Sequence, residues 1–176
     1  MKKIVVNDTN VFIDLFNIGL LEEFFSLPWE VHTTDFVMLE LEREGQKETV
    51  AKYQADKRLH IPAFDPKEVA EIAAMYQEYS NRTNLSLTDC SVWYYAKVNN
   101  CVLLTGDKKL RTMAIYDDVE VHGVIHVLDS LVECSKINFH TAIDKIKLLY
   151  DTNPRLPKEE KEKRLTLWQS KIEKKG

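Results

Sequence analysis

Short apolar segments alternate along this chain with longer segments that carry an apolar stripe, and this alternation constrains the fold more than any other feature. Residues 4–6, 29–33 and 101–104 are short runs with the composition or alternation of strands. Apolar residues at helical spacing predict helices between them. Strands that are separated by helices favour a parallel sheet covered on both faces, so we expect an α/β fold with a central parallel sheet.

Local signals place the remaining elements. Asp65 precedes Pro66, and Glu68 follows three residues after Asp65, which is the pattern of a capped helix N-terminus. We expect that helix to end before a polar loop at residues 80–84. Two more strands are predicted at 58–61 and 119–122, and two helical pieces at 11–25 that hinge near Gly19. Further helices are predicted at 36–41, 88–96, 108–115, 124–131 and 139–150. Thr34 or Asp35 caps the helix at 36–41, and Ser86 or Thr88 caps the helix at 88–96.

The composition is that of a globular chain with enough material for a core. Of its 176 residues, 44% are apolar and 30% are charged. The longest unbroken apolar run is Val92–Ala96, too short to span a membrane, and the apolar run near the N-terminus is too short for a signal peptide. Three scattered cysteines without a C-x-x-C pair favour neither a disulfide framework nor a zinc knuckle. We therefore expect a cytoplasmic protein that has no membrane partner.

Charge is distributed unevenly along the chain. The formal net charge is -4, but residues 154–176 are basic and the remainder is acidic. An acidic body does not indicate a nucleic-acid partner unless metal ions supply positive charge locally. We expect a domain over residues 1–150 and a basic helical C-terminal extension over residues 151–176. The stripe of Leu165, Trp168 and Ile172 predicts packing on the body or on a second copy, and the alternative is RNA steering by basic residues of the extension, which are Lys158, Lys161, Lys163 and Arg164.

Four acidic residues follow predicted strands in a related way. Asp8 comes directly after the first strand, and Asp107 follows the strand at 101–104 across one tight turn. Asp89 lies in the first turn of its helix, and Glu40 lies in the second turn of the helix that follows residues 29–33. Each acid alone is explained by a helix cap, the helix dipole or surface charge. Jointly they predict a ligand site, because the carboxyl ends of parallel strands share one edge of the sheet.

The chemistry of such a site follows from its donor atoms. Carboxylate oxygens without cysteine or histidine favour Mg²⁺ or Mn²⁺ over zinc. Four acids could hold one or two ions, and two ions can activate water and stabilise the leaving oxygen in phosphodiester cleavage. Asn10 and Thr105 are small polar neighbours that could orient the carboxylates or the attacking water.

Five segments of the chain resemble the motifs of the PIN-domain ribonucleases. They are residues 6–14, 37–41, 85–90, 103–111 and 121–129, and together they place the resemblance over residues 4–135. The resemblance implies a three-layer α/β/α fold with about five parallel strands, and metal-dependent cleavage of RNA. Many bacterial members are similar to virulence-associated protein C, the toxin of a type II toxin–antitoxin pair, which implies an antitoxin partner and a homodimer. The catalytic and metal-binding quartet would be Asp8, Glu40, Asp89 and Asp107, supported by Asn10 and Thr105.

Basic residues near these motifs are candidate RNA contacts, namely Arg82, Lys108, Lys109 and Arg111. Two alternatives stay open. A metal-binding phosphatase of the haloacid-dehalogenase type also has an acid after its first strand, but its Asp-x-Asp motif is broken here by Asn10, and Arg111 occupies the position of a later acid. The other alternative is a non-catalytic RNA-binding or protein-binding module whose acids are structural.

Overall fold

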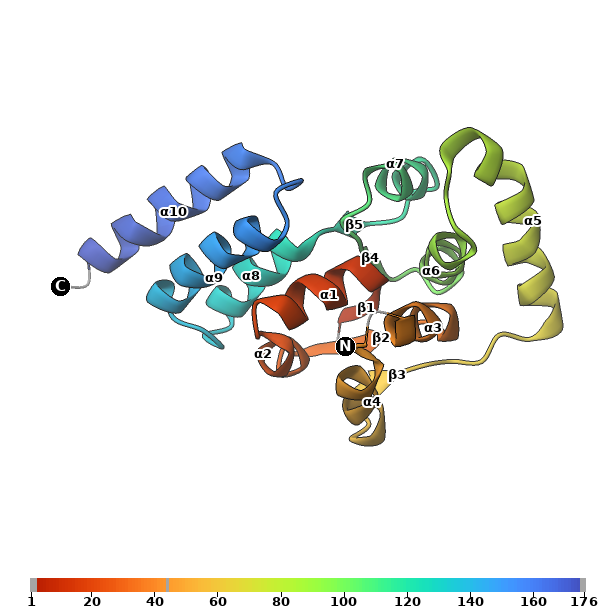
Figure 1. The fold of residues 1–176 in the computed structure, drawn as a ribbon, viewed down its shortest axis with the longest axis horizontal. Coiled ribbons are helices and arrows are strands. Elements are labelled where there is room, and N and C mark those ends of the chain that lie inside the picture. The colour runs from red at the N-terminus through yellow and green to blue at the C-terminus, as the bar shows by residue number, and fades with distance from the viewer. Residues whose placement is uncertain (1–2, 44, 175–176) are drawn as a thin grey trace. The chain divides into compact units, whose positions relative to one another are not determined.

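The computed structural model describes residues 3–43 and 45–174, which form two compact units (Figure 1). The sheet unit comprises the described residues up to Ile13 together with Pro28–Gly123. The helical unit comprises Asp14–Leu27 and the described residues from Val124 onward. The division falls inside one helix, so each unit is assembled from segments that are distant in the sequence.

The sheet unit is built on five parallel strands. Its strands are β1 (Lys3–Asn7), β2 (Trp29–His32), β3 (Leu59–His60), β4 (Val102–Leu104) and β5 (Val121–His122). Their order in space is β3-β2-β1-β4-β5, and in the central register Val5 pairs with Val31 on one side and with Val102 on the other (Figure 1). The predicted α/β class with a parallel sheet is confirmed. All five carboxyl ends therefore meet at one edge.

The central strands are buried because apolar residues occupy both of their faces. Val5 and Val6 of β1 and Leu103 and Leu104 of β4 have no exposed side-chain surface. A strand buried on both faces carries consecutive rather than alternating apolar residues, as these two do. They form the rigid base from which the polar residues after each strand project.

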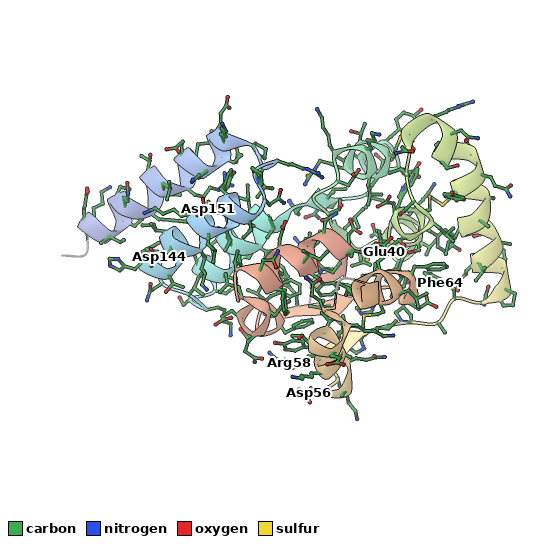
Figure 2. The ribbon with its side chains drawn as sticks, in the orientation of Figure 1. Glu40, Asp56, Arg58, Phe64, Asp144 and Asp151 are labelled. Carbon is green, nitrogen blue, oxygen red and sulfur yellow. The ribbon has the colours of Figure 1, made fainter. Side chains whose placement is uncertain are left out.

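Five further helices belong to the sheet unit. They are α3 (Asp35–Arg43), α4 (Lys47–Ala55), α5 (Pro66–Thr83), α6 (Leu87–Val98) and α7 (Lys108–Tyr116). Helix α6 packs against β1 and β4, which explains why most of its residues are buried. Phe64, labelled in Figure 2, lies in the segment before α5. Its ring contacts the rings of Tyr94 and Tyr95 on α6 and of Phe36 on α3.

The structure decides between the alternative caps. The Thr34 hydroxyl accepts a hydrogen bond from the Val37 N–H, so Thr34 caps α3. Ser86 caps α6, because its hydroxyl accepts from the Asp89 N–H. The predicted capping box of Asp65 and Glu68 is present at the start of α5.

Two elements differ from the sequence prediction. Helix α4 lies where no helix is predicted, because Val50 is its one buried residue among those described and a single residue makes no apolar stripe. Helix α5 continues to Thr83, through the segment predicted as a loop. It ends at Asn84, whose left-handed backbone (φ 61°) lets its N–H bond the Ser80 carbonyl.

The helical unit contains the end of α1 (Thr9–Asn17), which begins in the sheet unit. Its other helices are α2 (Leu21–Phe25), α8 (Val124–Glu133), α9 (Phe139–Thr152) and α10 (Lys158–Glu173). Gly19 separates α1 from α2 with a φ of +66°, at the predicted hinge. Helix α9 carries Asp144 and Asp151, both labelled in Figure 2.

The C-terminal helix that the sequence predicts is α10. It packs against α9, and its Trp168 is only 3% exposed. The Arg164 guanidinium of α10 donates to Asp129 of α8 over 2.8 Å, which holds the two helices together. It also donates to Glu160, one turn earlier on α10. Packing on the chain itself is thus what this structure shows for the extension.

Asp14 is a buried acid of α1. Acids of amphipathic helices usually lie at caps, in turns or on the helix surface, and the sequence alone predicts one of these places for Asp14, but its side chain is 5% exposed and accepts two hydrogen bonds from Asn153, at 3.1 and 3.2 Å. Burial raises the pKa of Asp14 to about 6. The partner lies in a distant segment, which local pattern does not predict.

Within the part of the chain that is described, no helix combines the length and apolar composition needed to cross a membrane.

Candidate active site

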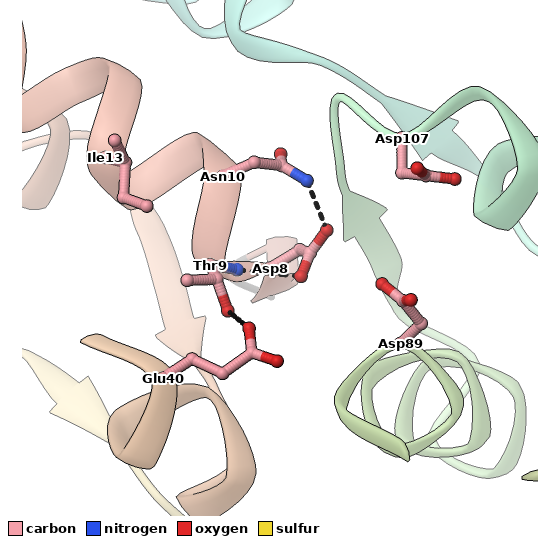
Figure 3. Close-up of a pocket in the computed structure, with 7 residues that line it drawn as sticks. All are labelled: Asp8, Thr9, Asn10, Ile13, Glu40, Asp89 and Asp107. Carbon is pink, nitrogen blue, oxygen red and sulfur yellow. Dashed lines mark hydrogen bonds between the residues drawn. The ribbon is translucent and has the colours of Figure 1, made fainter. Parts of the chain in front are cut away.

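A pocket of about 390 Å³ lies within the sheet unit (Figure 3). The four predicted acids all line it, although they come from four separate segments of the chain. No lysine, arginine or histidine is found among the described residues of its lining, which are Asp8, Thr9, Asn10, Ile13, Glu40, Asp89 and Asp107. The parallel sheet therefore brings the predicted quartet together around one pocket.

Asp8 is the most buried of the four, with 2% of its surface exposed. It follows β1 directly, and its N–H donates to the Leu104 carbonyl at the end of β4. Its Oδ1 accepts from the Thr9 N–H at 2.7 Å, and its Oδ2 accepts from Asn10 Nδ2 at 2.6 Å and Thr105 Oγ1 at 2.7 Å. All these donors are neutral. Burial, and then the negative charge of Asp89, raise the pKa of Asp8 to about 7.

Thr105, which is predicted as a supporting residue, forms hydrogen bonds with several parts of the site. Its side chain has no exposed surface; besides donating to Asp8, Oγ1 accepts from the Asp107 N–H at 3.0 Å. Asn10 bridges the same elements, because its Oδ1 accepts from the Gly106 N–H at 2.7 Å while its amide contacts Asp8. The turn after β4 and the start of α1 are thus held together through hydrogen bonds to one carboxylate.

Glu40 reaches the pocket from α3, and its Oε2 accepts from Thr9 Oγ1 at 2.7 Å (Figure 3). Sequence reasoning missed Thr9, which lines the pocket and holds Glu40. The signal was its hydroxyl, placed directly after Asp8 at the start of a helix. Ile13 was missed too; it lies one turn after Thr9 and forms an apolar part of the lining.

Asp89 and Asp107 have structural contacts as well as places in the pocket. Asp89 Oδ2 accepts from the Ser86 N–H at 2.7 Å, and Asp107 Oδ1 caps α7 by accepting from the Leu110 N–H at 2.7 Å. Figure 3 shows the Asp89 carboxylate turned toward Asp8. Burial raises the pKa of Asp89, and the charges of Asp107 and Glu40 add to this.

The four candidate RNA contacts lie in two different environments. Arg82, Lys108 and Lys109 line a second cavity in the sheet unit. The Arg111 guanidinium is half-buried and donates to the Val121 and Thr105 carbonyls, both at 3.2 Å. Arg111 therefore links the residue that follows β4 to β5.

The donor set fits a hard divalent cation. Every charged group that lines the pocket is a carboxylate, and none of its described lining residues is a cation that would balance this charge. Among the described residues, no three acidic, histidine or cysteine side chains already form a group that could hold a metal ion. Mg²⁺ is usually held by one or two carboxylates together with waters and phosphate oxygens, so it needs no such group.

Comparisons with known proteins agree with this fold. A family model described as a PIN domain (DUF3368) matches residues 4–170. PAE2754 from Pyrobaculum aerophilum is 14% identical, with a TM-score of 0.50, over 76% of this chain and 99% of its own. The family match and this likeness confirm the predicted three-layer α/β/α fold.

Two further structures are similar at lower scores. FitAcB from Neisseria gonorrhoeae is 19% identical over 69% of this chain and 99% of its own, with a TM-score of 0.44. A toxin–antitoxin complex from Klebsiella pneumoniae contains a chain that is 23% identical over 60% of this chain and 88% of its own, with a TM-score of 0.42. No curated protein sequence matches the chain.

Proposed function

This chain belongs to the PIN-domain family, and we propose that it is a divalent-metal-dependent endoribonuclease that cleaves RNA phosphodiester bonds. The observation that carries the proposal is the gathering of four carboxylates from separate segments around one pocket, with no cation among the described residues that line it. Membership of the PIN-domain family supports a nuclease role, and the all-oxygen donor set supports Mg²⁺ or Mn²⁺.

In this proposal Asp8, Glu40, Asp89 and Asp107 hold one or two ions. When bound there, the metal supplies a water of lowered pKa and positive charge beside the phosphoryl oxygens. Without compensation the four acids repel an RNA backbone, so a cation bound there would favour binding of the substrate at this pocket.

Neighbouring polar groups set the geometry of these acids. Asn10 and Thr105 hold Asp8 by two hydrogen bonds to the same oxygen, and Thr9 holds Glu40. Preorganised carboxylates need no rearrangement when the metal and the substrate bind, which keeps the reacting groups in a productive orientation.

The resemblance to bacterial toxins supports a finer version of this proposal. We propose that the chain is the toxin of a toxin–antitoxin pair, forms a homodimer, binds an antitoxin and acts in the cytoplasm. Growth arrest upon expression, relieved by co-expression of the neighbouring gene, is the expected result. Growth that is unaffected by expression of an active nuclease would contradict the toxin role and leave the nuclease role intact.

Cleavage of a mixed RNA pool tests the nuclease proposal. The purified chain should cleave RNA with Mn²⁺ or Mg²⁺ and stop when a chelator is added. Glu40→Gln keeps the side-chain shape and its bond from Thr9 but removes the charge, so it should lose cleavage. Glu162→Gln, on the exposed face of α10, is the matched control and should cleave like the wild type.

Other outcomes identify the rival functions. Hydrolysis of a small phosphomonoester, with RNA left intact, would favour the metal-binding phosphatase. RNA binding without cleavage of RNA or of a phosphomonoester would favour the non-catalytic module. Equal cleavage by the Glu40→Gln and Glu162→Gln variants would overturn the assignment of the site.

A further inference from the structure

The second cavity of the sheet unit has a volume of about 270 Å³ and lies between the end of α5 and helix α7. We call it the basic cavity; its lining is Arg82, Thr83, Lys108, Lys109, Thr112 and Met113. We call the pocket lined by Asp8, Glu40, Asp89 and Asp107 the acidic pocket. Lys108, in the basic cavity, directly follows Asp107 in the chain. The two cavities are therefore neighbours along the backbone and belong to the same unit.

The cations of the basic cavity are not neutralised by the protein. Among the described residues, Arg82, Lys108 and Lys109 form no ion pair, whereas Lys97 pairs with Asp117 at 2.9 Å. Three cations that share a cavity without an acid, in a chain of net charge -4, provide a local site for an external anion. Phosphate groups are the anions that Lys and Arg bind in nucleic acids.

The remaining lining is suited to a flat apolar group. The hydroxyl of Thr83 donates to the Tyr79 carbonyl at 2.7 Å, and that of Thr112 donates to the Lys108 carbonyl at 2.9 Å. Because each hydroxyl has one hydrogen, the three cations are the side-chain donors left for a ligand. Met113 is half-buried and supplies a polarizable apolar surface.

An apolar surface rimmed by cations complements a nucleotide, which combines an apolar base with an anionic phosphate. The volume lies just below the range of about 300–1,000 Å³ for pockets that hold drug-sized ligands, so it suits one base rather than several. A base can enter such a cavity only when it is unpaired and unstacked. Base-paired RNA cannot offer one.

We propose that the basic cavity binds one nucleotide of single-stranded RNA next to the phosphate cleaved in the acidic pocket. The inference rests on the proposed nuclease function, which supplies the RNA and the neighbouring cleavage point. Arg82, Lys108 and Lys109 bind the phosphate of this nucleotide, and Met113 packs against its base. Attachment at two points fixes the register of the strand, and the three cations offset the repulsion between RNA and the acids.

The phosphate part is tested by binding of a short fluorescent single-stranded RNA of mixed sequence, measured by anisotropy in the presence of chelator. The double variant Lys108→Met with Lys109→Met should bind about 10-fold more weakly, and its salt dependence should fall by about 0.7 per lost phosphate contact. The matched control, Lys52→Met with Lys67→Met, removes two exposed charges from α4 and from the far end of α5. It should change affinity less than about 2-fold.

The base part is tested with an abasic RNA of the same length. Wild-type protein should bind the ordinary RNA about 10-fold more tightly, because the contact between the base and the Met113 thioether contributes to the affinity. Met113→Ala should reduce this preference while leaving the affinity for abasic RNA unchanged. RNA duplex should compete less well than single-stranded RNA.

Several outcomes overturn the inference. Equal losses in the two double variants would mean that net charge alone governs binding. Equal affinity for ordinary and abasic RNA would show that the cavity does not bind a base. Competition by inorganic polyphosphate as effective as that by single-stranded RNA would show the same. Cleavage with an unchanged KM in the Lys108→Met, Lys109→Met variant would refute the inference alone. Binding as predicted without cleavage would refute only the proposed nuclease function.

Discussion

Replacing Thr105 by valine should separate the geometry of the site from its charges. Valine has nearly the size of threonine but lacks the hydroxyl, which donates to Asp8 at 2.7 Å and accepts from the Asp107 N–H at 3.0 Å. Thr105 has no exposed surface, so water cannot replace the hydroxyl at its own position. The substitution therefore removes one hydrogen bond to each of two acidic residues of the quartet.

The magnitude follows from those two bonds. A hydrogen bond to a charged group contributes about 1.5–3 kcal/mol, and an unsatisfied buried N–H costs about 1–3 kcal/mol. Since the Asp107 residue is only half-buried, we take the low end for its N–H and expect a loss of about 2–4 kcal/mol in the free energy of unfolding. The bond from Thr105 also lowers the pKa of Asp8 against the effect of burial. Its removal should shift the acidic limb of the pH–activity profile to higher pH.

Urea unfolding and RNA cleavage measure the two effects in the same proteins. Thr105→Ser is the control, because it keeps the hydroxyl and removes one methyl group, at a cost of about 1 kcal/mol. The serine variant should retain most cleavage and the wild-type pH profile. If the valine variant matches the serine variant in stability, in cleavage and in pH profile, the hydroxyl does not position Asp8 and this reasoning is refuted.

Other substitutions probe the remaining structure. Burial raises the pKa of Asp14 to about 6 from 3.8, so the folded state keeps a proton that the unfolded chain releases, and stability falls as the pH rises through this window. Between pH 4 and pH 8, the free energy of unfolding measured in urea should decrease by up to about 2 kcal/mol more in the wild type than in Asp14→Asn. An equal decrease in both proteins would contradict this. Arg111→Met should lower kcat more than it raises KM in RNA cleavage, because Arg111 holds the Thr105 and Val121 carbonyls; a rise in KM alone would assign Arg111 to RNA binding. Trp168→Ala should lower the free energy of unfolding by about 3–5 kcal/mol in urea, and a loss below about 1 kcal/mol would mean that α10 adds little stability.

The sequence was most informative where local chemistry and topology agree. A parallel sheet places all carboxyl strand ends at one edge, so recognising the strands before Asp8 and Asp107 was enough to predict that these acids meet. The capping box at Asp65 was predictable because its hydrogen bonds join residues three apart. For Asp89, the structure confirms the helix-cap interpretation and also places the residue in the pocket, since one oxygen completes a capping box while the residue lines the pocket.

Features that depend on distant partners were not predictable. Asp14 is buried because Asn153, 139 residues later, donates to both of its oxygens. Arg111 has the sequence context of a phosphate contact, and only the fold shows that its guanidinium donates to the backbone carbonyls of Thr105 and Val121. The local sequence around Asp14 or Arg111 does not predict a contact with a distant residue, because the same local sequence could lie on a solvent-exposed helix face.

A comparison of two carboxamide variants tests the central claim most directly. Asp8→Asn and Asp14→Asn each remove one buried carboxylate whose pKa is raised by burial, but only Asp8 lines the acidic pocket. RNA cleavage should be measured for both variants and the wild type at equal protein concentration with Mn²⁺, with and without chelator. We predict that Asp14→Asn cleaves like the wild type and that Asp8→Asn shows no metal-dependent cleavage. Metal-dependent cleavage at equal rates by both variants would contradict the assignment of the acidic pocket as the active site.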